Sequence, residues 1–407
     1  MVPAYPDSFI FVEEKKMKQL RLVLGAIILT SLMLIMGGKP AMAEEFPFGL
    51  LLVGPANDHG WSQAHFDAGK EIEKLLPGTK MLYIDKVNPA DRPGITIPML
   101  VADLVSKGAK LIIANSDDMK DGILEASLNH PEIQFIHISG DDALKGHADK
   151  NLSNLMGRME YTKMMAGFSA AMTSKTGKIA YLGPLINSET RRLTAAAYLG
   201  ARYAWTKVLQ KPASELSFKV SWIGFWFNIP GVTSDPTLVT NTLIDSGYDV
   251  IISGIDTTEA LVVAGQRKKA GKDVYAIPYD YQGACSVAPD ACLGVPYFNW
   301  IPGYKQLIGD AMNGKWKQQF LWLGPDWQDI NNPATSSVGF VKGNAMTDEV
   351  KAALIAFQKE LAGGLNLFSG PLNFQDKSSF LKAGETASDE QIWNLPQLLE
   401  GMEGASK

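Results

Sequence analysis

The chain has 407 residues, of which 46% are hydrophobic and 20% are charged, and it contains only two cysteines. This composition excludes a disordered chain, a collagen-like fibre and a small scaffold held by disulfides. The net charge of −5 argues against a nucleic-acid-binding protein, which needs a basic face. Since a single core rarely grows beyond about 250–300 residues, the length predicts two lobes with room for a ligand cleft.

The first 43 residues have the pattern of a secretory signal peptide. Basic residues between positions 15 and 21 precede an uncharged apolar run over 22–36, and an Ala-Met-Ala motif ends at Ala43. The run is shorter than the roughly 20 residues of a membrane-spanning helix, and the motif suits signal peptidase. We predict cleavage after Ala43 and export to the periplasm. A retained N-terminal anchor is the alternative, and Met17 is an alternative start.

The predicted mature chain has 364 residues and a net charge of −7, because the leader holds five basic and three acidic residues. Its two cysteines, Cys285 and Cys292, have six residues between them. In an oxidising compartment they can close a small disulfide loop, and two buried thiols are the alternative. A metal site is not expected, because two cysteines without a nearby histidine cannot fill a tetrahedral shell.

Two consecutive series of short apolar runs and helical segments follow the leader. The first series predicts strands at 47–54, 81–85, 110–115 and 134–140, with helices at 63–76, 96–107 and 121–128. The second predicts strands at 177–183, 217–224, 249–254 and 273–280, with helices at 156–173, 188–209, 236–246 and 257–270. Such runs are typical of parallel strands buried on both faces. Open α/β sheets bind ligands beyond the carboxyl ends of their strands, so a cleft is expected there.

The remaining segments carry weaker signals. Residues 281–300 look irregular, and a helix is expected at 301–313. After position 316 the chain is turn-rich, with a small hairpin expected over 363–374.

The loop after the first predicted strand carries the first candidate ligand-binding residues. It contains Asn57, Asp58 and Trp61, with Gly60 permitting a tight turn. An aromatic face beside amide and carboxylate groups suits a planar ring with N–H donors, such as a nucleobase. The alternative is that Asp58 or Ser62 only caps the helix that follows.

Polar and aromatic residues also follow the other predicted strands. The further candidates are Ser116, Asp117, Trp226, Phe227, Asp256, Asp280 and Trp300. Taken singly, each carboxylate could be a helix cap and each aromatic residue part of the core. Their common position at carboxyl ends favours a cleft for a neutral or weakly cationic ligand over one for a phosphate.

Enzyme and cofactor motifs are mostly missing. The chain lacks a G-x-G-x-x-G after the first strand, a Walker loop, G-x-S-x-G and H-E-x-x-H. His59 and His65, with Asp58 and Asp67, form the one cluster that resembles a metal or acid–base set. We therefore expect a binding protein without a cofactor or a metal.

Several segments, in their order and spacing, resemble one family. They are GPANDHGWSQAHFDAGK (54–70), NHPEIQFIHISG (129–140), AGFSAAMTSKTGKIAYLG (166–183), WIGFWFNIPG (222–231) and LIDSGYDVIISGIDTTEAL (243–261). The chain resembles the basic membrane protein family of ABC-transporter substrate-binding proteins, which includes purine nucleoside receptor lipoproteins. The resemblance covers about residues 46–404.

The chain departs from the nucleoside-binding branch of that family in its loops. The first loop is most similar to a branch associated with purine bases, and Asn299 stands where nucleoside binders carry a ribose-recognising lysine. Asp117 and Met119 occupy a loop where base-binding relatives can carry aromatic residues, so a ligand other than a purine stays open. The lipoprotein cysteine is missing, which implies a freely diffusing periplasmic receptor.

The resemblance implies the fold of a type I periplasmic binding protein, an α/β protein with two Rossmann-like lobes joined by three crossovers. The expected N-terminal lobe comprises 46–157 with 286–332, and the C-terminal lobe 158–285 with 333–407. The implied partners are a purine-like ligand and an ABC permease with its ATPase, and we expect a monomer. The alternatives are a sensor that presents a ligand to a membrane receptor, and a periplasmic nucleoside hydrolase that uses Asp58 and His59.

Overall fold

The first of two parallel sheets is built from the N-terminal part of the described residues and one later strand. The computed structural model describes Met1, Met17 and residues 45–407, so the predicted signal peptide lies outside the described residues apart from those two methionines. The sheet contains β1 (Phe46–Leu51), β2 (Thr79–Ile84), β3 (Leu111–Ala114), β4 (Gln134–Ile138), β5 (Leu152–Gly157) and β11 (Phe320–Leu323). Their order is β11-β5-β4-β3-β1-β2, and every pair is parallel.

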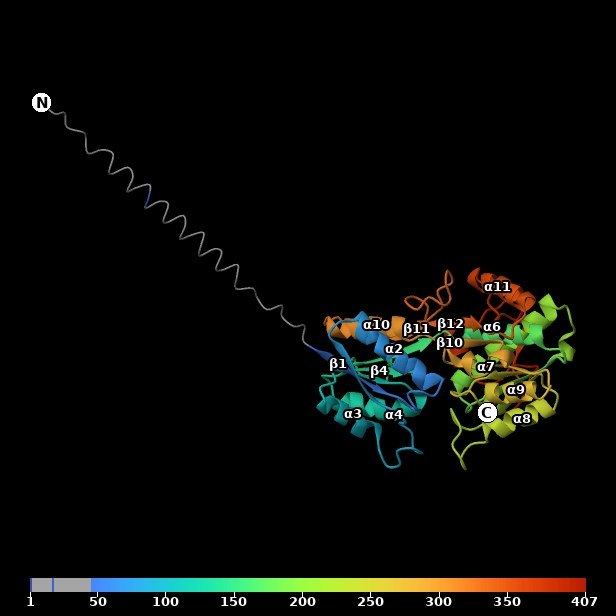
Figure 1. Cartoon of the computed structure of the whole chain (residues 1–407), viewed down its shortest axis with the longest axis horizontal. Coiled ribbons are helices and arrows are strands. Elements are labelled where there is room, and N and C mark those ends of the chain that lie inside the picture. Colours follow the sequence, from blue (N-terminus) through green and yellow to red (C-terminus); the bar gives the residue numbers. More distant parts are fainter. Residues whose placement is uncertain (2–16, 18–44) are drawn as a thin grey trace. The chain divides into compact units, whose positions relative to one another are not determined.

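Helices cover both faces of this sheet. They are α2 (Trp61–Leu75), α3 (Ile97–Ser106), α4 (Lys120–Asn129), the single turn α5 (Asp142–Lys145) and α10 (Ile301–Met312). Figure 1 shows α2 and α10 on one face and α3 and α4 on the other. This arrangement explains why β3 is entirely apolar and entirely buried, since neither face of the strand reaches water.

The second sheet repeats this pattern. It contains β6 (Lys178–Gly183), β7 (Ser217–Trp222), β8 (Val250–Ser253), β9 (Tyr275–Ile277) and β15 (Met402–Glu403), in the parallel order β15-β7-β6-β8-β9. Its helices are α6 (Glu160–Thr173), α7 (Ser188–Tyr203), α8 (Pro236–Asp245), α9 (Glu259–Lys269), α11 (Asp348–Ala362) and α12 (Asp389–Trp393). Figure 1 places α8 and α9 on the face opposite α6 and α7.

The chain passes between the two sheets three times. It leaves the first sheet between β5 and α6, and returns after β9 through β10 (Gly294–Phe298) to α10 and β11. It leaves again through β12 (Val338–Lys342), which pairs antiparallel with β10. The expected α/β architecture with three crossovers is therefore confirmed, while the residue boundaries given to the two lobes stay a prediction.

Some local expectations are wrong. The helix expected from 156 begins at Glu160, because β5 occupies 152–157. Asn154 in β5 is polar and interrupts the apolar pattern of that strand. Its side chain is hydrogen-bonded in the structure, because it accepts the Ala143 N–H at 2.8 Å and donates to the His137 carbonyl at 3.3 Å. The irregular segment 281–300 contains β10, and the turn-rich C-terminal part contains α11.

The C-terminal hairpin is also shifted from its expected place. It pairs β13 (Leu372–Asn373) with β14 (Ser379–Leu381), which lie beyond most of the 363–374 segment.

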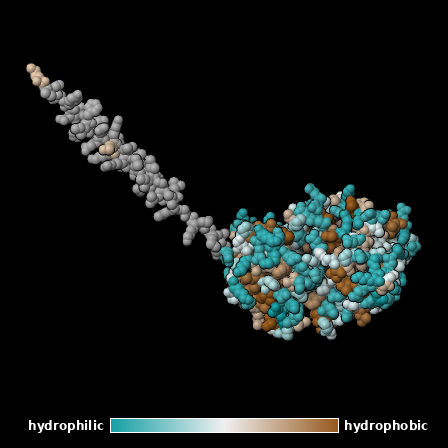
Figure 2. Space-filling model, in the orientation of Figure 1, coloured by the Kyte–Doolittle hydropathy of each residue, from teal (hydrophilic) through white to brown (hydrophobic). Residues whose placement is uncertain are grey.

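The surface of the described residues is mostly hydrophilic on the face in view in Figure 2, as expected when the apolar strands are buried under helices. Apolar residues on that face form small scattered groups. Within residues 45–407, every helix falls short of the length and apolar character needed to cross a membrane.

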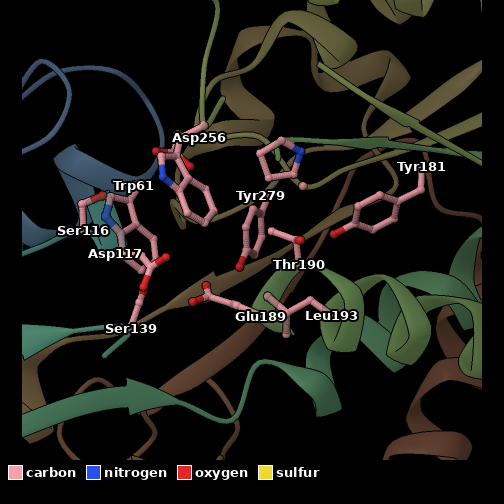
Figure 3. A pocket seen from close by; sticks show the side chains of 13 residues that line it. Trp61, Ser116, Asp117, Ser139, Tyr181, Glu189, Thr190, Leu193, Asp256 and Tyr279 are labelled. Carbon is pink, nitrogen blue, oxygen red and sulfur yellow. The ribbon is translucent and has the colours of Figure 1, made fainter. Parts of the chain in front are cut away.

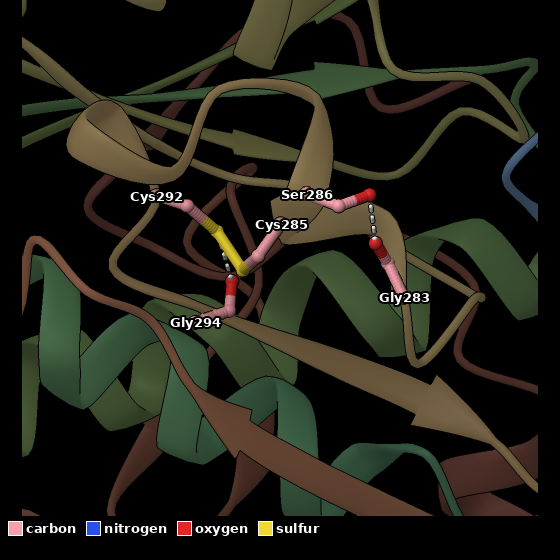
Figure 4. Close-up of a disulfide and its surroundings, with 5 residues drawn as sticks. All are labelled: Gly283, Cys285, Ser286, Cys292 and Gly294. Atoms are coloured by element: carbon pink, nitrogen blue, oxygen red, sulfur yellow. Dashed lines mark hydrogen bonds between the residues drawn. A yellow bond between two sulfur atoms is a disulfide. The ribbon is translucent and has the colours of Figure 1, made fainter.

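Cys285 and Cys292 form a disulfide, as the sequence favoured (Figure 4). The bond closes the two short 3-10 turns, Ala284–Val287 and Pro289–Ala291, that precede β10. Cys292 is fully buried, and its carbonyl accepts the Ala345 N–H at 3.0 Å. The disulfide thus joins the two turns before β10, and the Cys292 carbonyl links them to the segment that follows β12.

Replacing both cysteines with alanine should lower the free energy of unfolding by about 2 kcal/mol, because the bond restricts a short loop of the unfolded chain. Urea denaturation of the mature protein, followed by circular dichroism, measures this change. Reduction of the unmodified protein is the control and should reproduce the shift. An unchanged denaturation midpoint in both cases would contradict the prediction.

Candidate ligand-binding site

A cavity lies where the carboxyl ends of strands from both sheets meet, which is where open α/β sheets bind their ligands. The lining residues are Trp61, Ser116, Asp117, Ser139, Tyr181, Pro184, Glu189, Thr190, Leu193, Trp226, Gly254, Asp256 and Tyr279. Figure 3 shows the side chains of Trp61, Asp117, Glu189 and Tyr279 converging on the cavity from different elements.

Trp61 is the first residue of α2 and forms one wall of the cavity. Its Nε1 donates to the Asn115 carbonyl at 2.6 Å, at the end of β3. Its ring meets the rings of Phe298 and Trp300 edge to face, each with centroids 5.2 Å apart. These contacts fix the indole orientation, so one face can serve as a rigid stacking surface.

Asp58 positions this wall and does not line the cavity. Its carboxylate accepts the backbone N–H groups of Gly60, Ser62 and Gln63 at 2.8–3.0 Å, which otherwise lack partners at the start of α2. Burial raises the pKa of Asp58, and these three hydrogen bonds oppose the rise. Asn57 is exposed and outside the cavity. The capping role considered for Asp58 is therefore the one seen.

The loop after β3 brings Ser116 and Asp117 to the cavity. The Ser116 hydroxyl accepts the Asp118 N–H at 3.3 Å, which places Asp117 at the start of a 3-10 turn. Asp117 Oδ2 accepts from Asn187 Nδ2 at 3.3 Å. Since Asn187 caps α7 on the second sheet, this contact crosses between the two lobes.

Trp226 and Asp256 form the facing wall on the second sheet. Trp226 is 8% exposed, and its Nε1 has no hydrogen-bond partner among the described residues. Asp256 is also buried, and burial raises its pKa well above the ordinary value, with Asp280 and Asp58 adding repulsion. A ligand here meets one unpaired N–H donor and a carboxyl group that favours its protonated form. The adjacent Phe227 packs against Phe225 and does not line the cavity.

Asp280 and Trp300 lie behind the walls of the cavity. Asp280 is fully buried with a φ of 70°, and burial raises its pKa well above the usual range. Lys163 Nζ lowers that pKa by its charge, and it lies 3.3 Å over the ring of Tyr279, which does line the cavity. Trp300 stacks on His65 with centroids 4.2 Å apart. Both residues therefore support the walls in this conformation.

Sequence reasoning missed a group of lining residues on the second sheet and one on the first. They are Ser139, Tyr181, Pro184, Glu189, Thr190, Leu193, Gly254 and Tyr279. Glu189 and Thr190 belong to the first turn of α7, which follows β6. Because ligands bind beyond the carboxyl ends of such strands, this position in the sequence could have predicted them. Burial raises the pKa of Glu189 to about 7, while the nearby Arg192 lowers it.

The two lobes touch at backbone level beside the cavity. Gly60 packs so closely on Asp256 that an added Cβ would lie 1.6 Å from the Asp256 carbonyl oxygen. Only glycine allows this approach, so the walls carried by Trp61 and Asp256 can close on each other.

Comparison with known families agrees with this architecture. Residues 47–338 match the Bmp family model, described as ABC transporter substrate-binding protein PnrA-like. The chain belongs to this family. The expected resemblance is thereby confirmed, and the family consists of substrate-binding proteins that work with a small-molecule ligand and a membrane permease.

Relatives of this family member bear names that refer to different ligands. A purine-binding protein of Brucella abortus (strain 2308) is 28% identical over 380 residues, which is 93% of this chain and 98% of that protein. A Haloferax volcanii protein that carries the provisional name ABC transporter glucose-binding protein TsgA13 is 23% identical over 359 residues, covering 86% and 83%.

A solved structure supports the fold. The ABC transporter solute-binding protein from Aeropyrum pernix K1 superposes with a TM-score of 0.62 at 12% identity, covering 88% of this chain and all of that one. The chain has the α/β fold of type I periplasmic binding proteins, as expected.

Gly60→Ala should prevent full closure of the lobes and weaken ligand binding at least tenfold, about 1.4 kcal/mol. Isothermal titration calorimetry measures the affinity, and small-angle scattering measures closure. Gly309→Ala is the matched control, because that helical glycine has open space around its Cβ position. Equal affinities in the two variants would contradict the closure role of Gly60.

Proposed function

We propose that this protein binds a purine base or nucleoside between its lobes and delivers it to an ABC permease and ATPase. The observation that carries the proposal is the pairing of two tryptophan walls, Trp61 and Trp226, with carboxyl groups in one cavity. The purine-binding name of the Brucella relative supports it.

The proposed ligand is held by stacking on the tryptophan rings and by hydrogen bonds to the carboxyl groups. Flat indole faces suit a planar heteroaromatic ring, and each stacked base is worth about 1–3 kcal/mol. Asp117 and Asp256 offer oxygen acceptors for N–H groups. None of the thirteen described lining residues is a lysine, an arginine or a histidine, which disfavours a phosphorylated ligand.

A hexose is the principal competing ligand class, since a Haloferax relative is named for glucose. Sugars also use carboxylates and tryptophan faces. They differ from purines because their hydroxyl groups surround the ring and leave only small apolar patches for stacking. A cavity with aromatic walls on both lobes favours the flat ring.

Export is part of the proposal. A leader over residues 1–43 and the lack of a cysteine beside Ala43 support a freely diffusing periplasmic receptor. N-terminal sequencing of the protein from a periplasmic extract tests this, because cleavage leaves Glu44 as the first residue.

Native mass spectrometry of the purified mature protein is the first test of ligand identity, because receptors of this kind can retain their ligand through purification. Isothermal titration calorimetry with adenine, guanine, adenosine, guanosine and glucose then measures affinities. A purine with submicromolar affinity and no heat from glucose supports the proposal. Binding of glucose without binding of any purine overturns it.

Trp226→Ala should weaken purine binding by about 1–3 kcal/mol, roughly 5- to 150-fold, through loss of one stacking face. Calorimetry with the best purine of the panel measures the loss. Trp316→Ala is the control, because Trp316 is half-buried, donates to the Lys150 carbonyl and lies outside the cavity. If both variants bind like the unmodified protein, Trp226 is not a stacking wall.

A further inference from the structure

Glu189 brings a buried carboxylate oxygen to the cavity wall. Glu189 is 6% exposed, and its Oε2 has no hydrogen-bond partner in residues 45–407. Arg192 Nη2 forms a long ion pair with that oxygen at 4.0 Å, and this nitrogen has no hydrogen-bond partner within the same residues. A buried acceptor without a donor is unfavourable, so a ligand that donates to Oε2 gains affinity.

Arg192 is held in place by other partners and cannot swing freely toward Glu189. Its Nε donates to Glu160 Oε1 at 2.8 Å, and its guanidinium lies 4.2 Å over the ring of Trp393. Arg192 is 1% exposed, so these contacts enclose it completely. The Glu189 carboxylate therefore stays available to a ligand.

The other carboxyl groups of the cavity add oxygens that can accept from a ligand, and Asp256 does so in its protonated form. Asp117 receives one amide N–H from Asn187, and Asp256 lies on the facing lobe. Three carboxyl groups line the cavity, and no basic side chain accompanies them among its lining residues. A ligand rich in N–H groups satisfies this wall better than one rich in acceptors.

We propose that Glu189 is the specificity-determining residue of the cavity and that its carboxylate selects a purine with two adjacent N–H donors, as in a 2-amino-6-oxopurine. The ring N–H and the amino group of such a purine can donate in parallel to the two oxygens of one carboxylate. A 6-aminopurine offers one donor beside an acceptor, and a 6-oxopurine without an amino group offers one donor. This inference rests on the proposed purine binding and names the purine class.

Tryptophan fluorescence titrations with guanine, adenine and hypoxanthine at pH 8 test the proposal. The unmodified protein should bind guanine at least tenfold more tightly than hypoxanthine. Glu189→Gln should lose at least tenfold in guanine affinity and keep or improve adenine affinity, because an amide offers one donor and one acceptor. Glu349→Gln is the matched control: Glu349 holds the same second position in α11 but is exposed, so its affinities should not change.

The pH dependence gives a second readout. Burial raises the pKa of Glu189 to about 7, with Arg192 lowering it, Asp117 and Glu160 raising it, and the Ser139 side chain favouring the charged form. Asp256 and Asp280 also interact with this group. The carboxylate predominates at pH 8 and the protonated form at pH 6, so guanine affinity should fall about tenfold between them. In Glu189→Gln this fall should disappear.

The outcomes separate this inference from the function on which it rests. If the unmodified protein prefers adenine and Glu189→Gln leaves that preference unchanged, the role of Glu189 is overturned while purine binding stands. If the unmodified protein binds no purine, both proposals fail. Should thermal melting show that Glu189→Gln does not fold, Glu189→Asp replaces it: withdrawal of the carboxylate by one methylene should weaken guanine more than hypoxanthine, and an equal effect on both counts against the proposal.

Discussion

A buried carboxyl group must receive N–H or O–H donors, pair with a cation or keep its proton. That constraint governs the region between the lobes, where Asp256, Asp280 and Glu189 are all buried and all have raised pKa values. In the proposed function, a ligand with N–H donors takes the place of water beside these groups when the lobes close on it.

The walls of the cavity depend on residues that do not touch it. Asp58 organises the turn before α2 through backbone N–H groups, and this turn sets the direction of the Trp61 indole. Gly60 in the same turn allows the close contact with the Asp256 carbonyl. Lys163 lies beneath the Tyr279 ring on the other lobe. The residues that line the cavity are thus held in place by other residues that lie behind them.

The sequence predicted the two parallel sheets because their strands are uninterrupted apolar runs, and it predicted that ligand-facing residues follow those strands. It missed β5, whose polar Asn154 is satisfied only by contacts with residues distant along the chain. It missed α11 although Thr347 caps that helix and Val350, Leu354, Phe357 and Leu361 form its buried stripe. The separation of Asp58 from the cavity depends on backbone geometry, which residue type and spacing do not reveal.

The interleaved order of the strands bears on how the protein can be synthesised. The first sheet is not complete until β11 has been made, and the second sheet takes its edge strand β15 from residues 402–403, near the C-terminus. Completion of the second sheet therefore waits for residues 402–403, whereas the first sheet can form as soon as β11 has been made. The two lobes thus become complete at different stages of synthesis, the first before the second.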